Sequence, residues 1–181
     1  MRLRFLIGWL LVGGGLPVLT HAADPADPPP CSIPESRQFD FWAGDWDVTS
    51  ADGKRKAGHN RIEPVLGGCA LHESWTGASG FRGNSYSSYD RSRGVWHQTW
   101  VDVGGTVLLL EGGLRDGAMV LEGDQPDADG PVRNRITWTP NADGTVRQHW
   151  QVSKDDGGHW KSVFDGIYHR SEAGTHSAGA E

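Results

Sequence analysis

The sequence lacks the short motifs that identify common hydrolases. It has neither a G-x-S-x-G turn, which presents the nucleophile of α/β-hydrolases, nor an H-E-x-x-H pair, which holds zinc on a helix. His72 and Glu73 would supply an acid and a base, but neighbouring residues on a strand point to opposite faces. We therefore expect no catalytic residue, and an enzymatic role has no positive support from motifs.

Positive charge is scarce. The chain has 17 Lys and Arg against 23 Asp and Glu, a net charge of −6, and no basic run. Nucleic acids and anionic membrane surfaces attract basic patches. We therefore expect neither as a partner.

Metal-binding spacing is missing as well. Histidines occur in the segments expected to be strands, but none shows H-x-H or H-x-x-x-H spacing: His59, His72, His97, His149, His159 and His169. We expect no metal and no cofactor. The alternative is a haem held by one histidine, as in nitrobindin-like barrels.

Only the first 22 residues contain a long hydrophobic run. Arg2 and Arg4 precede an apolar stretch over residues 5–19, and Thr20-His21-Ala22 provides a small-x-small cleavage site. The run is short and glycine-rich for a membrane span. We expect a signal peptide over residues 1–22, a periplasmic or secreted protein, and no stable membrane anchor after cleavage. Loss of the two arginines changes the net charge from −6 to −6 − 2 = −8.

Cysteine is nearly absent. Cys31 and Cys69 are the two cysteines of the chain, and an exported protein meets an oxidising compartment. They predict one disulfide, which would contribute about 3–4 kcal/mol by closing the intervening loop. Two unpaired buried thiols are the alternative.

Helical periodicity is absent apart from a short aromatic turn around Phe39. The chain instead alternates apolar and polar residues in short runs separated by Gly, Asp and Asn turns. The first of ten such runs begins near Trp46. The other nine cover residues 58–65, 69–76, 84–89, 95–103, 106–111, 118–122, 132–139, 145–153 and 159–169. Tight turns favour an antiparallel meander, and closure removes its edges. We predict an all-β, up-and-down barrel of about eight to ten strands.

The same patterns divide the chain into an N-terminal arm, a barrel and a tail. Residues 23–37, which include the spacer DPADPPP, are expected to form an extended N-terminal arm. The barrel is expected over residues 38–170. The small, polar segment over residues 171–181 is expected to be a disordered tail.

The stretch QFDFWAGDWDV joins the aromatic turn to the first strand. Gly44 permits a sharp change of direction, and Trp46 supplies the large apolar area needed to close a barrel end. This is a G-x-W pattern, in which Trp46 is predicted to close the barrel. The alternative is a tryptophan in the core of a β-sandwich.

Five segments together resemble a bacterial family of exported, lipocalin-like (calycin-type) proteins with an FW-x-G-x-W-D motif. They are FDFWAGDWDV, NRIEPVLGGCALHESW, GVWHQTWVD, RITWTP and FDGIYHR. The resemblance implies a calycin-type barrel and brings no activity with it. In lipocalins an arginine near the end of the barrel stacks across the G-x-W tryptophan, and Arg170 is the matching residue for Trp46.

Aromatic and polar residues share single strand faces. Alternation places three tryptophans and three polar residues on the inward faces: Glu73, Trp75, Gln98, Trp100, Gln148 and Trp150. A dry core avoids unpaired Glu and Gln, whereas a ligand cavity combines apolar walls with a few polar groups. These six residues are predicted to bind a ligand, and His72, Ser74, Thr99 and His149 to face outward. The alternative is a wet barrel mouth without a ligand.

Three function classes follow. The first is a binding protein for a small hydrophobic or amphipathic molecule, which would make a small lipophilic ligand its partner. The second is a barrel enzyme, an isomerase or lyase, which an enclosed carboxylate with a shifted pKa would favour. The third is a structural or partner-binding barrel with a filled interior. The oligomeric state stays open.

Overall fold

The structure is a computed structural model that describes residues 31–171. The expected signal peptide over residues 1–22, the spacer before Cys31 and the tail from residue 172 onward lie outside the described residues.

Ten strands and three short 3-10 helices make up the described chain. The helices are η1 (Pro34–Arg37), η2 (Asp40–Trp42) and η3 (Leu66–Gly68). The strands are β1 (Gly44–Ser50), β2 (Lys56–Val65), β3 (Ala70–Gly77), β4 (Arg82–Asp90), β5 (Val95–Asp102), β6 (Val107–Arg115), β7 (Ala118–Gln125), β8 (Val132–Pro140), β9 (Val146–Ser153) and β10 (Lys161–Arg170). No helix within residues 31–171 is long and apolar enough to cross a bilayer.

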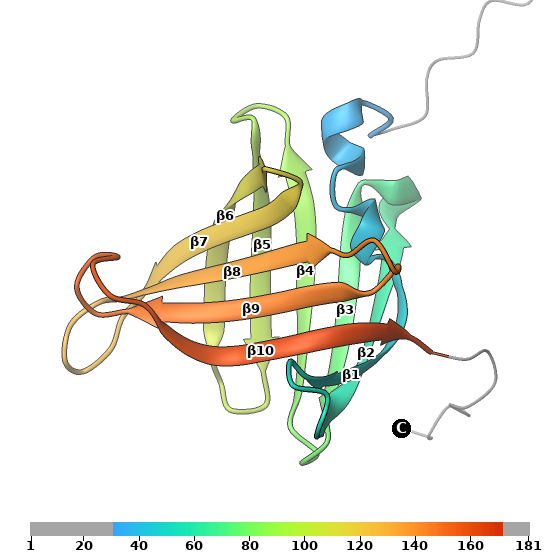
Figure 1. Ribbon diagram of the computed structural model, residues 1–181. Helices are drawn as coiled ribbons and strands as arrows, with labels where there is room; N and C mark the ends of the chain where they lie inside the picture. Colours follow the sequence, from blue (N-terminus) through green and yellow to red (C-terminus); the bar gives the residue numbers. More distant parts are fainter. Residues whose placement is uncertain (1–30, 172–181) are drawn as a thin grey trace, which may run out of the picture.

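The strands form one closed antiparallel barrel in which each pairs with its neighbours in sequence. The sheet closes where β1 pairs with β10, with Trp46 opposite Arg170, and Figure 1 shows these two strands side by side. The predicted all-β up-and-down barrel is confirmed, with ten strands. Within residues 31–171, closure leaves no strand with an unpaired edge through which another sheet could associate.

Residue chemistry explains the tight turns. Between β6 and β7 the two loop residues Asp116 and Gly117 have φ values of 50° and 83°. Positive φ at both positions is the mirror-image turn that matches the twist of two adjacent strands. Asp and Gly tolerate this conformation better than most residues.

Aromatic side chains fill one end of the barrel. Phe39 and Trp42, which we call the plug, are fully buried and stack with ring centroids 4.9 Å apart. The Phe39 ring also meets Trp96 of β5 at 5.7 Å and Trp138 of β8 at 5.1 Å. The indole N–H of Trp46 donates to the carbonyl of Trp42 at 2.9 Å, so the first strand is joined directly to the plug.

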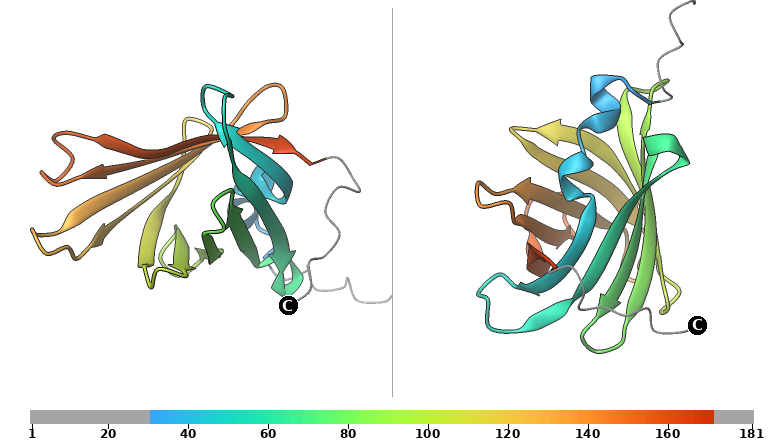
Figure 2. Two further views of the ribbon diagram at one scale, coloured as in Figure 1. Left: turned by 90° about the horizontal axis from the view of Figure 1, so that it is seen from below. Right: turned by 90° about the vertical axis from the view of Figure 1, so that its right-hand side faces the viewer.

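A disulfide holds the N-terminal segment to the barrel. Cys31 and Cys69 are bonded, with their Cα atoms 5.1 Å apart, which confirms the predicted bridge. Arg37 adds a hydrogen bond to the carbonyl of Gly68 at 3.1 Å. Figure 2 shows this N-terminal segment beside one end of the barrel, close to β2 and β3.

Part of the expected extended arm is helical. Residues 34–37 form η1 instead of continuing extended, and Ser36 is buried. Pro34 occupies the first helical position, where its fixed φ suits a helix and its missing N–H costs nothing. Pro34, which lies after the proline-rich spacer, therefore starts a short helical turn.

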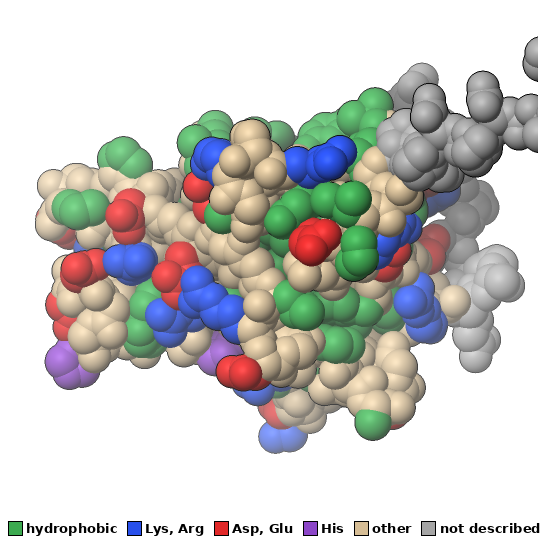
Figure 3. All heavy atoms as spheres, turned by 90° about the horizontal axis from the view of Figure 1, so that it is seen from above, with side chains coloured by type: hydrophobic (Ala, Val, Ile, Leu, Met, Phe, Trp, Pro, Cys, Tyr) green, Lys and Arg blue, Asp and Glu red, His purple; other side chains and the backbone are tan. Residues whose placement is uncertain are grey.

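Charges of both signs alternate on the surface. Figure 3 shows acidic and basic side chains interspersed on the face it presents. Exposed ion pairs contribute little to stability individually. The carboxylate of Glu122 is less exposed, and it pairs with Arg135 and, at 3.4 Å, with Arg133.

Candidate ligand-binding cavity

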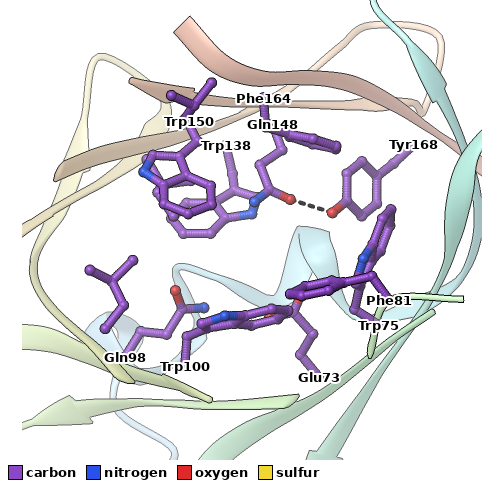
Figure 4. Close-up of a pocket in the computed structure, with 13 residues that line it drawn as sticks. Glu73, Trp75, Phe81, Gln98, Trp100, Trp138, Gln148, Trp150, Phe164 and Tyr168 are labelled. Atoms are coloured by element: carbon purple, nitrogen blue, oxygen red, sulfur yellow. Dashed lines mark hydrogen bonds between the residues drawn. The ribbon is translucent and has the colours of Figure 1, made fainter. Parts of the chain in front are cut away.

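A cavity of about 220 Å³ lies inside the barrel on the side away from the plug (Figure 4). It is partly open to solvent. Most of its lining is aromatic or aliphatic, with a few polar groups: Glu73, Trp75, Phe81, Gln98, Trp100, Leu108, Ile136, Trp138, Gln148, Trp150, Val163, Phe164 and Tyr168. This mixture is typical of sites for small organic ligands, although the volume is below the usual range of about 300–1,000 Å³.

All six residues predicted to share an interior line this cavity. In Figure 4, Glu73, Trp75, Gln98 and Trp100 rise from one wall, and Gln148 and Trp150 face them from the other. The structure therefore brings together side chains from β3, β5 and β9. Whether these residues bind a ligand stays a prediction.

The residues expected to face outward lie outside the cavity lining. His72 stacks on Tyr86 of β4, with ring centroids 4.8 Å apart. His149 and Ser162 hydrogen bond at 3.0 Å at an exposed position. The adjacent pair His72 and Glu73 is thus split between the two faces of the sheet, and His72 cannot act together with Glu73 in the cavity.

Inward-facing residues follow one another in the same order along several strands. Starting from the plug, β5 presents Trp96, then Gln98, then Trp100. On β3 the corresponding order is Leu71, Glu73 and Trp75. The cavity therefore has a polar floor next to the plug layer and an aromatic rim farther out.

Two glycines give the rim its space. The ring of Trp100 lies so close to Gly83 that a Cβ there would be 2.2 Å from it. At Gly58 a Cβ would be 2.7 Å from the ring of Trp75. Because both glycines lack side chains, the two indoles lie against the wall, and their rings do not project across the cavity.

Two of the three indole N–H groups at the rim have protein partners. Trp150 donates to Asn134 Oδ1 at 2.9 Å, and Trp100 donates to Asp102 Oδ2 at 3.1 Å. These bonds fix the orientation of both rings. The ring faces are then the part of each side chain left for a guest.

Glu73 is the central group of the floor. Its side chain is buried, with the residue 4% exposed. Its carboxylate accepts hydrogen bonds from Asn60 Nδ2 at 2.7 Å and from the Ser85 hydroxyl at 2.6 Å. Burial raises the pKa of Glu73 to about 7, and the two hydrogen bonds oppose that rise by stabilising the charged form.

Glutamine side chains complete the floor. Gln98 donates through Nε2 to the hydroxyls of Ser85 and Ser87 at 3.2 and 3.1 Å. Across the cavity, the phenol of Tyr168 donates to Gln148 Oε1, the contact dashed in Figure 4. Burial, reinforced by the nearby Glu73 charge, raises the pKa of Tyr168 well above its ordinary value, so this phenol stays protonated.

The lining carries one carboxyl group and no basic side chain. None of the described residues around the cavity is Lys, Arg or His. Within residues 31–171, moreover, no three His, Cys, Asp or Glu side chains are grouped so that they could hold a metal ion. The lining residues themselves offer stacking, hydrogen bonding and proton exchange at Glu73.

Sequence reasoning did not identify the other lining residues. Phe81 precedes β4, where alternation gives no guidance, and Val163 lies within a register shift of β10 that falls between Ser162 and Phe164. Trp138 and Tyr168 do follow strand alternation, and the aromatic signal used for the six predicted residues could have found them.

Comparison with known proteins leaves the family open. No family model matches the chain, and no curated protein is similar enough to count as a relative.

Proposed function

We propose that this protein is an exported β-barrel that binds a small hydrophobic or amphipathic molecule in its interior. The observation that carries the proposal is the cavity of about 220 Å³ in which tryptophan faces surround a polar floor. A purely structural barrel would fill this space with side chains, because protein interiors pack densely. The residues that would contact the guest are Glu73, Trp75, Gln98, Trp100, Gln148 and Trp150.

Export is supported by two independent features. The N-terminal 22 residues have the charge, apolar run and small-residue site of a signal peptide. The Cys31–Cys69 bridge is of the kind that persists in oxidising compartments. Together they favour a periplasmic or secreted protein.

The proposed kinship is with lipocalin-like barrels. The closed antiparallel meander is compatible with that architecture. Arg170 lies over the ring of Trp46, the tryptophan of the G-x-W pattern that begins at Gly44. Barrels of this size have room for one small ligand, which is the property the proposal uses.

Native mass spectrometry of protein purified from its own host tests the proposal directly, since a retained guest adds mass that denaturation removes. Calorimetry with one- and two-ring lipophiles such as 2-phenylethanol and 1-naphthol is the second arm. Trp100→Ala should weaken binding roughly tenfold by removing one wall. Trp160→Ala, at a position outside the lining, should leave it unchanged. The proposal fails if no guest is retained and no lipophile binds.

One observation favours a barrel enzyme as the second candidate. Glu73 is an enclosed carboxyl whose pKa of about 7 suits proton transfer near neutral pH. An isomerase or lyase acting on the bound molecule could use it as general acid and base. Glu73→Gln separates the two functions: a binding protein converts nothing in either form, whereas an enzyme loses turnover of its retained guest while still binding it.

A further inference from the structure

The floor of the cavity presents the Glu73 carboxylate and Gln98 Oε1 as hydrogen-bond acceptors, beside one amide donor, Gln148 Nε2. Asn60 Nδ2 donates to both Glu73 Oε1 and the Tyr168 oxygen, at 2.7 and 3.1 Å. Asn60 itself is fully buried and lies outside the cavity lining, so its amide positions Glu73 and Tyr168 and does not face a guest. Gln98 uses its amide nitrogen on two serine hydroxyls, and within residues 31–171 its oxygen accepts no hydrogen bond.

The charge of the lining points the same way. Glu73 is an acid, Tyr168 stays a neutral phenol, and no described lining residue is Lys, Arg or His. A carboxylate guest would meet Glu73 with no cation to balance it, which disfavours two like charges in one small enclosed site. An ammonium group has the opposite properties: it carries positive charge and up to three N–H donors.

The walls suit a cation as well. Indole and phenyl faces attract positive charge through their ring quadrupoles, and Trp75, Trp100 and Trp150 all line the cavity. Phe164 meets Trp75 edge to face, with ring centroids 6.0 Å apart, so the aromatic wall is continuous between β3 and β10.

We infer that the guest is a small organic amine, bound as an ammonium ion whose N–H groups face the Glu73 carboxylate while its apolar body lies between the tryptophan faces. The inference rests on the proposed function, because it names the ligand class of the same cavity. The ammonium pairs with ionised Glu73, so at a pH near 7 binding releases a proton from this carboxyl. A body of one or two rings matches the volume of about 220 Å³.

Three probes of similar shape and different charge provide the test: 2-phenylethylammonium, 2-phenylethanol and phenylacetate. Calorimetry with the mature protein at pH 8 should show the ammonium binding at least about tenfold more tightly than the alcohol, with the carboxylate weakest. Glu73→Gln should bring the ammonium within about threefold of the alcohol. Glu63→Gln, at a half-exposed carboxylate paired with Arg61 on β2, is the matched control and should keep the preference.

A wild-type measurement guards against a variant that fails to fold. At pH 6.5, ammonium binding measured in two buffers of different ionisation heat should reveal proton release, and alcohol binding should not. Equal affinities for the three probes, tightest binding of the carboxylate, or no ammonium binding overturns the inference. If the alcohol or 1-naphthol still binds in those cases, the proposed function survives; if no probe binds and no guest is retained, both fail.

Discussion

The guanidinium of Arg170 lies over the indole of Trp46, with its Cζ atom 3.8 Å from the ring centroid. The two residues are directly opposed on β10 and β1, the pair of strands that closes the barrel. Arg170 also donates to the carbonyl of Ala43 at 2.8 Å. A single side chain at the end of the last strand thus contacts both the start of the first strand and the turn before it.

Trp46→Ala should lower the free energy of unfolding by roughly 3–5 kcal/mol, because a fully buried indole leaves a large void. Arg170→Met, which keeps the aliphatic stem, should cost on the order of 1 kcal/mol. Urea denaturation followed by circular dichroism measures both changes. Trp160→Ala is the matched control, because Trp160 also has an arginine over its ring, with Arg135 Cζ 4.0 Å from the centroid, and lies outside the cavity lining. This substitution should cost clearly less than Trp46→Ala. Equal losses at the two tryptophans would contradict this assignment.

The disulfide should account for about 3–4 kcal/mol of stability by restricting the unfolded chain. Denatured, unreduced protein should show no thiol that reacts with a labelling reagent, and reduced protein two. The double variant Cys31→Ser/Cys69→Ser should unfold at lower urea concentration with no change in slope beyond that expected for a less compact denatured state. Unchanged stability after reduction would show that the remaining contacts of the N-terminal segment hold it alone.

Gly83→Ala should close part of the cavity. The added methyl would lie 2.2 Å from the Trp100 ring, so the indole must swing away from the wall into the space for a guest. Binding of 2-phenylethanol should weaken about tenfold or more. Gly113→Ala on β6 is the control, because a Cβ there meets nothing within 4 Å. An unchanged affinity in Gly83→Ala would show that Trp100 does not limit the binding space.

Stability should depend on pH through Glu73. Its pKa rises from an ordinary 4.5 to about 7 in the folded protein, so the folded state binds the proton more tightly. This contribution is fully present below pH 4.5 and is lost as the pH rises through 7, for a total of about 3 kcal/mol at ~1.4 kcal/mol per pKa unit. Denaturation at pH 5 and pH 8 should show the loss in the wild type and a smaller one in Glu73→Gln.

The facing groups do not interfere in that range. Among the described lining residues the other ionisable group is Tyr168, which stays protonated throughout. Carboxylates with lowered pKa values, such as Asp90 and Asp155, lose their contributions in more acidic solution. A wild type and a Glu73→Gln variant with the same pH dependence between 5 and 8 would contradict the assignment.

Local patterns predicted the fold because each strand carries its own alternation and each turn its own glycine or aspartate. The same parity placed Trp75 and Trp100 toward one interior, since indoles avoid water. The hydrogen bonds of Glu73 were beyond this reasoning. They depend on register, which sets Asn60 near Glu73 across β2 and β3, and Ser85 opposite Glu73 across β3 and β4.

Other features of the cavity could not be predicted from the sequence, for different reasons. A register shift between Ser162 and Phe164, with Val163 inside it, breaks the period-two pattern in β10. Phe81 reaches the rim from outside a strand. The pKa of Glu73 follows from burial by the whole barrel, which no local sequence window encodes.

The plug also determines the end of the barrel through which a guest would enter the cavity. Phe39 and Trp42 close one end, and the Cys31–Cys69 bridge holds their segment in place, while Phe81 and Val163, which are 42% and 48% exposed, stand where the cavity meets solvent. Under the proposed function, a guest with one polar end would enter with that end first and pass the tryptophans before it reached Glu73. On leaving, its polar contacts would break first and its aromatic contacts last.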